Sequence, residues 1–417
     1  MLVRFLRDDP DVTTVEEGAS SYVPGGFHPV YVGDVFKDRY KVLNKLGYGM
    51  YSTVWLVRDL KNTSSSRGPE HEFRALKILI ADCYGWGDDD LYKTEVLDRL
   101  RRGDRTKLGY NYICHLLDDF VHRGPNGAHV CMVFELMGET LKAFGAWFNQ
   151  GNLPEALVRR FTVQLLLALD FAHSLNIIHT DIKPDNIFLR FRDYSRIERY
   201  LQEVDTPMQD RDEAEYTIVP SQSLRKHYFS VVDGIDRVME FDVALGDWGL
   251  ACFEGKHRTQ IIQSIPCRAP EVLLGERWDK STDLWNLGCA VYEAWASESL
   301  FKGRVLPSTR YDLQQHLYEI VQLFGSFPYD LRCRADWNIV SEYFEPCGYV
   351  KDRPRRREGE LAWRDTKFLP HVPDNDVRRE FYEFLKALMP IDPLERTSAQ
   401  HLMGHPWLES RSATAGE

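Results

Sequence analysis

The chain changes its hydrophobic pattern once, near residue 138, and this change limits the folds that it can adopt. Before that point, short runs of Val, Leu, Ile and aromatic residues alternate with polar turns, which is typical of β-strands. After it, apolar residues recur at helical spacing. The predicted strands are residues 41–46, 52–60, 73–80 and 129–137, and the predicted helices are residues 91–102, 141–149 and 156–175. We therefore expect an α+β fold with two lobes, the first β-rich and the second mainly helical.

The same pattern suggests how the chain is divided. We assign residues 1–39 to an N-terminal extension, 40–138 to the first lobe, 139–408 to the second lobe and 409–417 to a C-terminal tail. Residues 191–240 are charged and contain a run of acids, so we expect an insert in the second lobe that is exposed and partly disordered, with a short helix at 194–204.

Composition narrows the class of protein further. The 417 residues carry a formal net charge of −11, which disfavours sequence-independent binding to nucleic acid. Eight scattered cysteines without a C-x-x-C pair suggest reduced thiols. The N-terminus lacks the apolar core of a signal peptide, and the most apolar stretch, 163–172, is too short to span a membrane. We expect a soluble intracellular protein.

Two motifs of the first lobe suit a phosphate ligand. Gly47 and Gly49 lie between two predicted strands, where the backbone could approach an anion closely, although a tight hairpin explains two glycines equally well. Lys77 lies inside an apolar strand, where it could reach solvent along its stem or pair with Glu95 on the next helix.

The second lobe contains the stronger motif, His179-Thr180-Asp181-Ile182-Lys183-Pro184-Asp185-Asn186. Here an Asp could accept a hydroxyl proton, a Lys could neutralise phosphate charge and an Asn could bind a metal. Asp247 ends a predicted strand at 243–245 and is a reasonable Mg²⁺ ligand, although a simple turn would also place an Asp before Gly249.

A third group of residues in the second lobe suggests buried salt bridges. Ala269-Pro270-Glu271 precedes an apolar segment, and Asp283 and Arg396 follow later in the chain. A buried acid needs a partner, and we expect Arg396 to be the partner of Glu271.

The order of these motifs is that of the protein kinases, which the chain resembles over residues 40–408. The segments at 27–56, 179–186, 249–263 and 405–408 (FHPVYVGDVFKDRYKVLNKLGYGMYSTVWL, HTDIKPDN, GLACFEGKHRTQIIQ and HPWL) are similar to the SR-protein kinases, a branch of the CMGC group, and so is the large insert. The resemblance implies the two-lobed kinase fold, and phosphorylation of Ser or Thr with ATP and Mg²⁺.

Carried over by motif, the resemblance also assigns roles to residues of this chain. Asp181 is the expected catalytic base, Lys183 lies beside the γ-phosphate, and Asn186 and Asp247 bind Mg²⁺. Lys77 holds the α- and β-phosphates, and Glu95 holds Lys77. The expected ATP-binding residues are Leu46, Gly47, Tyr48, Gly49, Val54, Ala75, Lys77, Glu95, Phe134, Glu135, Met137 and Phe188.

The resemblance leaves the substrate open. Protein substrates are expected, including basic Arg/Ser-rich ones, but Gln314 and Gln315 stand where the family has acids. Thr180 replaces the Arg that usually precedes the catalytic Asp, which suggests activity without phosphorylation of the segment 247–271. A monomer without membrane or direct nucleic-acid partners, in the cytoplasm, the nucleus or both, is the expectation. The alternatives are a pseudokinase scaffold and a dual-specificity CMGC kinase.

Overall fold

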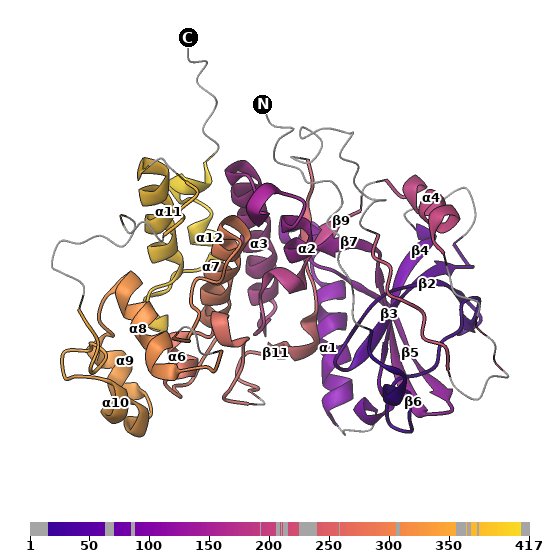
Figure 1. The fold of residues 1–417 in the computed structure, drawn as a ribbon, viewed down its shortest axis with the longest axis horizontal. Helices are drawn as coiled ribbons and strands as arrows, with labels where there is room; N and C mark the ends of the chain where they lie inside the picture. Colours follow the sequence, from indigo (N-terminus) through magenta and orange to yellow (C-terminus); the bar gives the residue numbers. More distant parts are fainter. Residues whose placement is uncertain are drawn as a thin grey trace, which may run out of the picture. The chain divides into compact units, whose positions relative to one another are not determined.

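A computed structural model describes most of the chain, in two compact units (Figure 1). Unit 1 comprises residues 1–103, 114–140 and 188–242, and unit 2 comprises 104–113, 141–187 and 243–417. The described residues are 16–62, 71–84, 88–191, 193–205, 209, 211, 216–224, 240–257, 259–305, 309–355, 364, 368–372 and 375–409. Most of the predicted C-terminal tail and much of the insert lie outside them.

Unit 1 is built on a six-stranded sheet with the order β1-β2-β3-β4-β6-β5. Its strands pair in antiparallel fashion and place Val, Leu and aromatic side chains on a buried face. The strands are β1 (Val35–Phe36), β2 (Tyr40–Gly49), β3 (Ser52–Asp59), β4 (Phe73–Leu79), β5 (Leu116–Gly124) and β6 (Gly127–Glu135). The sequence analysis missed β5, an edge strand whose Asp118 and Asp119 break the apolar pattern.

Besides the sheet, the described part of unit 1 includes helices and a short strand pair. Helix α1 spans Asp88–Arg102, and α4 spans Ser195–Glu203, which confirms the short helix predicted in the insert. Strand β7 (Met137–Thr140) pairs with β9 (Ile187–Arg190).

The core of unit 1 includes residues that are distant in sequence from the sheet. Val30 of the N-terminal extension and Val219 of the insert are both fully buried in the cluster that contains Trp55. In α4, Ile197 and Tyr200 are buried as well. The expectation of an exposed insert is therefore wrong for these residues, because they cover apolar side chains of unit 1.

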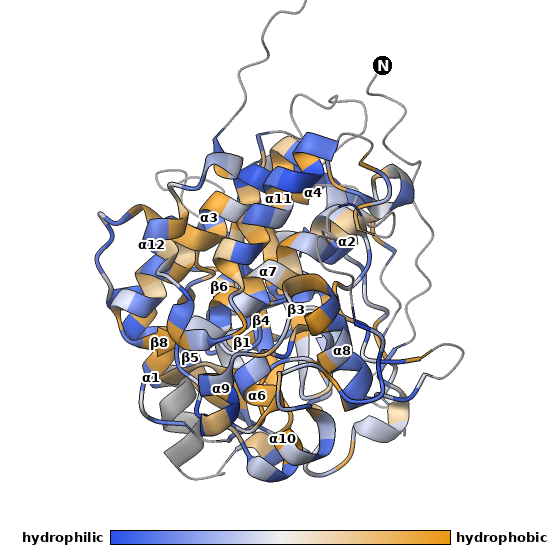
Figure 2. Cartoon of the chain, turned by 90° about the vertical axis from the view of Figure 1, so that its left-hand side faces the viewer, coloured by the Kyte–Doolittle hydropathy of each residue, from blue (hydrophilic) through white to orange (hydrophobic). Residues whose placement is uncertain are grey.

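Unit 2 is mainly helical. Its helices are α2 (Leu141–Gly145), α3 (Glu155–Ser174), α6 (Pro270–Leu273), α7 (Ser281–Ala296), α8 (Leu313–Phe324), α9 (Tyr329–Arg334), α10 (Trp337–Tyr343), α11 (Asn375–Leu388) and α12 (Ala399–Leu402), and its short strands are β8 (Ile177–Ile178), β10 (Val243–Leu245) and β11 (Cys252–Phe253). In Figure 2, α3 is largely hydrophobic, whereas α11 shows a hydrophilic side, as expected for a core helix and a covering helix.

Buried polar contacts support the helical unit. The carboxylate of Glu271 accepts two hydrogen bonds of 2.7 Å from Arg396, and neither side chain is exposed. This confirms the predicted partner of Glu271. The eight cysteines, all of which lie among the described residues, form no disulfide. None of the helices among the described residues combines the length and apolarity needed to cross a bilayer.

Candidate active site

The loop from His179 to Asn186 follows β8 and brings three of the predicted catalytic side chains together. The carboxylate of Asp181 accepts hydrogen bonds from Lys183 Nζ at 2.7 Å and from Asn186 Nδ2 at 3.1 Å. Asn186 Nδ2 also donates to the Asp181 carbonyl at 2.8 Å. A short 3₁₀ turn, Pro184–Asn186, folds the Asn back toward the Asp. The arrangement fixes one acid between a cation and an amide.

The ionic contact also affects the charge state of Lys183. Partial burial disfavours its ammonium form, but the hydrogen bond to Asp181 and the nearby acids Asp185 and Asp247 outweigh this and raise the pKa of Lys183. Lys183 is therefore a fixed positive charge at neutral pH, beside a carboxylate that keeps a small exposed area (8% of Asp181).

Asp283 of helix α7 binds the backbone of this loop. Its carboxylate accepts the N–H groups of His179 and Thr180, each at 2.9 Å, and lies 2.9 Å from His173 Nε2. Asp283 is fully buried, so these contacts compensate the cost of removing its charge from water. From sequence, Asp283 has only a general structural role, because nothing local in STDLWNLG shows that it reaches residues 179–180.

Thr180 connects the loop to the segment that follows Asp247. It adopts a left-handed conformation with φ 71°, which is strained for a β-branched residue. Its hydroxyl donates to the Leu250 carbonyl at 3.0 Å. A neutral hydroxyl thus makes the contact at the position where the expected pattern has an Arg.

Asp247 lies two residues after the end of β10, and its neighbours contact the same loop. The N–H of its neighbour Gly246 donates to the Asn186 carbonyl at 2.9 Å, and the Gly246 carbonyl lies 2.9 Å from His179 Nε2. The following residue, Trp248, is buried against the His179 ring, with the ring centroids 4.5 Å apart. These contacts place Asp247 near the charge of Lys183.

Unit 1 contains the residues expected around the nucleotide. Strands β2 and β3 form a hairpin in which Gly47 pairs with Val54 and Tyr48 with Thr53. Leu46 and Gly49 belong to the same strand, β2. The side chains of Tyr48, Met50 and Tyr51 are exposed at this end of the hairpin.

Strands β4 and β6 of the same sheet contain further residues that are predicted to bind the nucleotide. Lys77 of β4 pairs with Val54 of β3 on one side and with Met132 of β6 on the other, while Ala75 pairs with Phe134. The paired positions place Val54, Ala75, Lys77 and Phe134 on three consecutive strands.

The predicted ion pair joins Lys77 of β4 to Glu95 of α1. Glu95 lies on α1 with an exposed side chain, and no ion pair between these two residues is found in the described part of unit 1. That pair stays a prediction.

The end of β6 leads to the residues expected beside adenine. In the pairing of β7 with β9, Met137 lies opposite Arg190 and Thr140 lies opposite Phe188. The carboxylate of Glu135 lies 3.7 Å from Arg190, and burial raises the pKa of Glu135 in spite of that charge. Phe134 and Glu135 thus lie at the end of β6, and Met137 and Phe188 lie on the paired strands β7 and β9 that follow.

Comparisons with known proteins decide the family. The protein kinase domain model matches residues 40–199 and 235–408. The chain is a protein kinase.

The chain is also similar to kinases of the SR-protein kinase type. It is 31% identical to serine/threonine-protein kinase SRPK of Physarum polycephalum, over 94% of this chain and 91% of the relative. It is 29% identical to protein kinase dsk1 of Schizosaccharomyces pombe (95% and 86%) and 24% identical to serine/threonine-protein kinase SKY1 of Saccharomyces cerevisiae (94% and 78%). The predicted α+β kinase fold and the predicted class, a serine/threonine-protein kinase of the SR-protein kinase type, are confirmed.

A protein kinase domain uses ATP and Mg²⁺ in general. We call residues 179–186 the kinase loop, and Asn186 of this loop offers a suitable metal ligand. Asn186 uses its Nδ2 for Asp181, which leaves the oxygen Oδ1 outside those two bonds. Asp247 adds a carboxylate. Mg²⁺ takes one or two such protein oxygens and keeps room for phosphate oxygens and water, so the donor set fits this ion.

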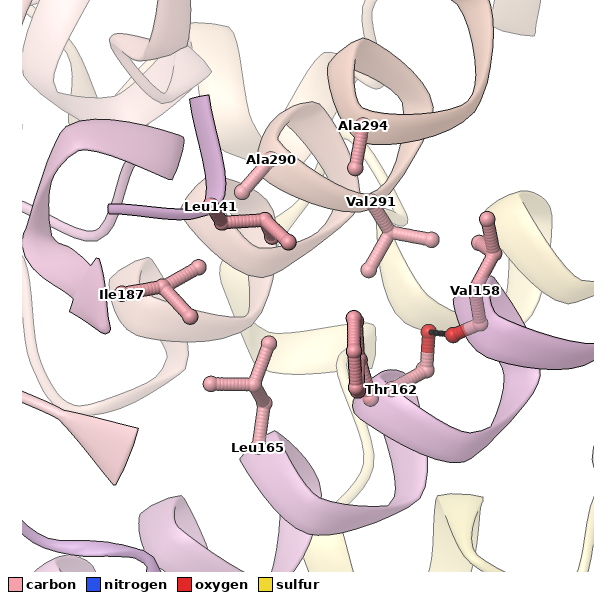
Figure 3. Close-up of a pocket in the computed structure, with 9 residues that line it drawn as sticks. Leu141, Val158, Thr162, Leu165, Ile187, Ala290, Val291 and Ala294 are labelled. Carbon is pink, nitrogen blue, oxygen red and sulfur yellow. Dashed lines mark hydrogen bonds between the residues drawn. The ribbon is translucent and has the colours of Figure 1, made fainter. Parts of the chain in front are cut away.

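A small apolar cavity is lined by residues of α2, α3, β9 and α7 (Figure 3). Leu165, Ile187 and Val291 point into it from three different elements, and Thr162 closes one side by donating to the Val158 carbonyl at 2.7 Å. Its volume, about 10 Å³, is at the lower limit for one water molecule. We attribute it to imperfect packing rather than to ligand binding.

Proposed function

We propose that the protein transfers the γ-phosphate of ATP, as its Mg²⁺ complex, to Ser and Thr hydroxyls of protein substrates. The observation that carries this proposal is the Asp181 carboxylate, held by Lys183 and Asn186 in a loop that α7 fastens through Asp283.

The roles of the loop residues follow from their chemistry. Asp181 accepts the hydroxyl proton of the substrate, since its carboxylate is fixed and still partly exposed. Lys183 carries a positive charge that neutralises the transferred phosphoryl group. Asn186 and Asp247 would hold Mg²⁺, which supplies charge neutralisation at the phosphates.

The residues of unit 1 supply the nucleotide site in this proposal. The hairpin from Leu46 to Val54 covers the phosphates, Lys77 contacts the α- and β-phosphates, and Phe134 to Met137 contact adenine. The strand registers support this assignment for Val54, Lys77 and Phe134, because they bring these residues to adjacent strands of one sheet. The contact of Glu95 with Lys77 is proposed for the nucleotide-bound state.

We further propose that the kinase is active without phosphorylation of the segment 247–271. An Arg at position 180 would need an anion to hold that segment. Thr180 instead donates a neutral hydrogen bond to Leu250. Treatment with a phosphatase should leave most of the activity in place, and loss of most of the activity would contradict the proposal.

The substrate sequence is the finer part of the proposal. The relatives include one named SRPK, which keeps Arg/Ser-rich proteins among the candidate substrates. On helix α8, however, Asp312 already has a partner, because Arg353 of the same chain lies 3.9 Å away. Gln314 donates to the Lys351 carbonyl at 3.0 Å. These contacts support a protein kinase whose docking of basic peptides differs from that of the family.

Two other functions are weighed against this one. A pseudokinase scaffold is disfavoured because Lys77, Asp181, Asn186 and Asp247 are all present. A dual-specificity kinase is favoured by the Ala269-Pro270-Glu271 sequence alone. We keep a monomer in the cytoplasm, the nucleus or both as the working prediction.

One experiment separates these functions. Purified protein is given labelled ATP and Mg²⁺ on an array of Arg-Ser, proline-directed and acidic peptides, and the labelled residues are identified. Labelled Ser and Thr are expected. Label on Tyr would indicate dual specificity, and absence of transfer to every peptide would contradict the proposal.

A further inference from the structure

A fully buried lysine lies directly before the glycine-rich hairpin. Lys45 belongs to β2, one residue before Leu46, and its side chain has no exposed area. Its ammonium group donates to Glu16 at 2.7 Å and to Glu17 at 2.6 Å. Burying an ammonium group without an acidic partner costs much free energy, so the carboxylates of Glu16 and Glu17 stabilise Lys45 in its buried position.

The insert completes the same cluster from another part of the sequence. The Glu16 carboxylate also accepts the N–H of Ser221 at 2.6 Å and its hydroxyl at 3.0 Å. The N–H of Gln222 donates to the Lys45 carbonyl at 3.0 Å. We call Glu16, Glu17, Lys45 and Ser221 the Lys45 cluster. The cluster holds the side chain of Lys45, and the next residue of the insert, Gln222, holds its backbone.

The charge state of the cluster agrees with its geometry. Burial alone raises the pKa of Glu16, but the hydrogen bonds from Lys45 and Ser221 outweigh burial and lower the pKa below its usual value. Glu16 is therefore ionised at neutral pH and pairs with the cation.

The cluster also reaches the hairpin itself. Lys45 Nζ lies 5.3 Å from the centroid of the Tyr48 ring, within cation–π range. Tyr48 lies between Gly47 and Gly49, the positions proposed to approach the phosphates. The contact thus runs from residues 16–17 and 221 through Lys45 to the centre of the glycine-rich hairpin.

We infer that Lys45 is a positioning residue for the nucleotide: the Lys45 cluster holds the strand that enters the glycine-rich hairpin and so sets the affinity for ATP. The N-terminal extension and the insert then belong to the nucleotide site, although neither carries a residue proposed to touch ATP. This inference rests on the proposed function, since it assigns the hairpin to ATP.

A purely structural role is the alternative, and a second ion pair of the same two strands provides the control. Arg39, which precedes β2, donates two hydrogen bonds of 2.7 Å to Asp59 of β3. Tyr40 pairs with Asp59 at the end of the β2–β3 ladder opposite Gly49. Arg39→Met therefore removes a charged contact of the same strand with the buried Asp59, from a side chain that is 28% exposed and lies far along the strand from the hairpin.

The test compares Lys45→Met, Lys45→Arg, Glu17→Gln and Arg39→Met in the full chain. Nucleotide affinity is measured by titration with a fluorescent ATP analogue and Mg²⁺, and KM for ATP and kcat are measured with a peptide substrate. We expect about tenfold weaker nucleotide binding and a matching rise in KM for Lys45→Met and Glu17→Gln, with kcat within about twofold. Lys45→Arg keeps the charge and should restore most of the affinity.

The control decides between the two roles. Arg39→Met should lower the melting temperature as the Lys45 variants do, without changing nucleotide affinity. Equal effects of Arg39→Met and Lys45→Met on affinity, or unchanged affinity in both Lys45→Met and Glu17→Gln, would overturn the inference. If Lys45→Met does not fold, Glu17→Gln carries the test alone. Because binding is read directly, a protein that binds ATP without transferring phosphate would contradict the proposed function and still test this inference.

Discussion

Replacing Glu271 by Gln should strongly destabilise unit 2. The substitution keeps the shape of the side chain and removes the charge that faces Arg396. Neither side chain is exposed, and the guanidinium stays charged at any pH at which the protein folds. Arg396 keeps its bonds to the Ser281 carbonyl at 3.2 Å and the Pro390 carbonyl at 2.9 Å, but these neutral groups do not balance a buried cation.

The expected loss is about 3–5 kcal/mol of unfolding free energy, the usual result of removing one partner of a buried pair. This is a large part of a typical total of about 5–15 kcal/mol. The double variant Glu271→Leu/Arg396→Met should lose less than either single change, because no unpaired charge is left.

Native-state hydrogen exchange at the amides of α7 is the appropriate assay, since the chain has two compact units and one melting curve would average them. The control is Glu383→Gln in α11 of the same unit, where the pair with Lys386 is about half exposed and should be worth less than about 0.5 kcal/mol. A loss below about 1 kcal/mol for Glu271→Gln would refute the reasoning.

Three shorter predictions concern the kinase loop, pH and the metal. Asp283→Asn weakens the acceptor of the His179 and Thr180 amides, so steady-state kinetics should show kcat lower by about 10²-fold with KM for ATP within about twofold, and an unchanged kcat would contradict this role. Burial, together with the Arg268 charge, lowers the pKa of His316 to about 3, so its contribution to stability is complete above pH 6.5 and is lost as the pH falls. Urea unfolding should show a loss of roughly 1.5 kcal/mol between pH 6.5 and 5 that is absent in His316→Phe, and equal slopes would argue against it. Chelation of Mg²⁺ should abolish transfer, and Asn186→Ala should raise the Mg²⁺ concentration for half-maximal rate; an unchanged Mg²⁺ dependence would exclude Asn186 as a ligand.

Much of the fold follows from local patterns. The strands around Trp55 and Lys77 and the long helix 156–175 have the spacing that their structures require, and the order of the motifs pointed to the kinase fold. Strand β5 did not follow, because Asp118 at the sheet edge is stabilised by Lys37 and Tyr40, which come from elsewhere in the chain.

The candidate site likewise contains residues that a local pattern reveals and residues that depend on distant partners. Asp181, Lys183 and Asn186 could be found because they stand within six residues. Asp283 and Lys45 could not be assigned their roles, since Lys45 depends on a partner 28 residues away and Asp283 on one 104 residues away, and no local pattern reveals either. The same holds for Val219, which lies in the charged insert and is nevertheless buried in the core of unit 1.

The most direct test of the central claim is a single-turnover measurement of phosphate transfer from ATP to a Ser/Thr peptide by Asp181→Ala. The matched control is Asp185→Ala, which removes an acid of the same loop whose side chain is 47% exposed. We predict a rate lower by about 10²- to 10⁴-fold for Asp181→Ala, with nucleotide affinity unchanged within about twofold, and a nearly normal rate for the control. An Asp181→Ala protein that transfers phosphate at the wild-type rate would contradict the account.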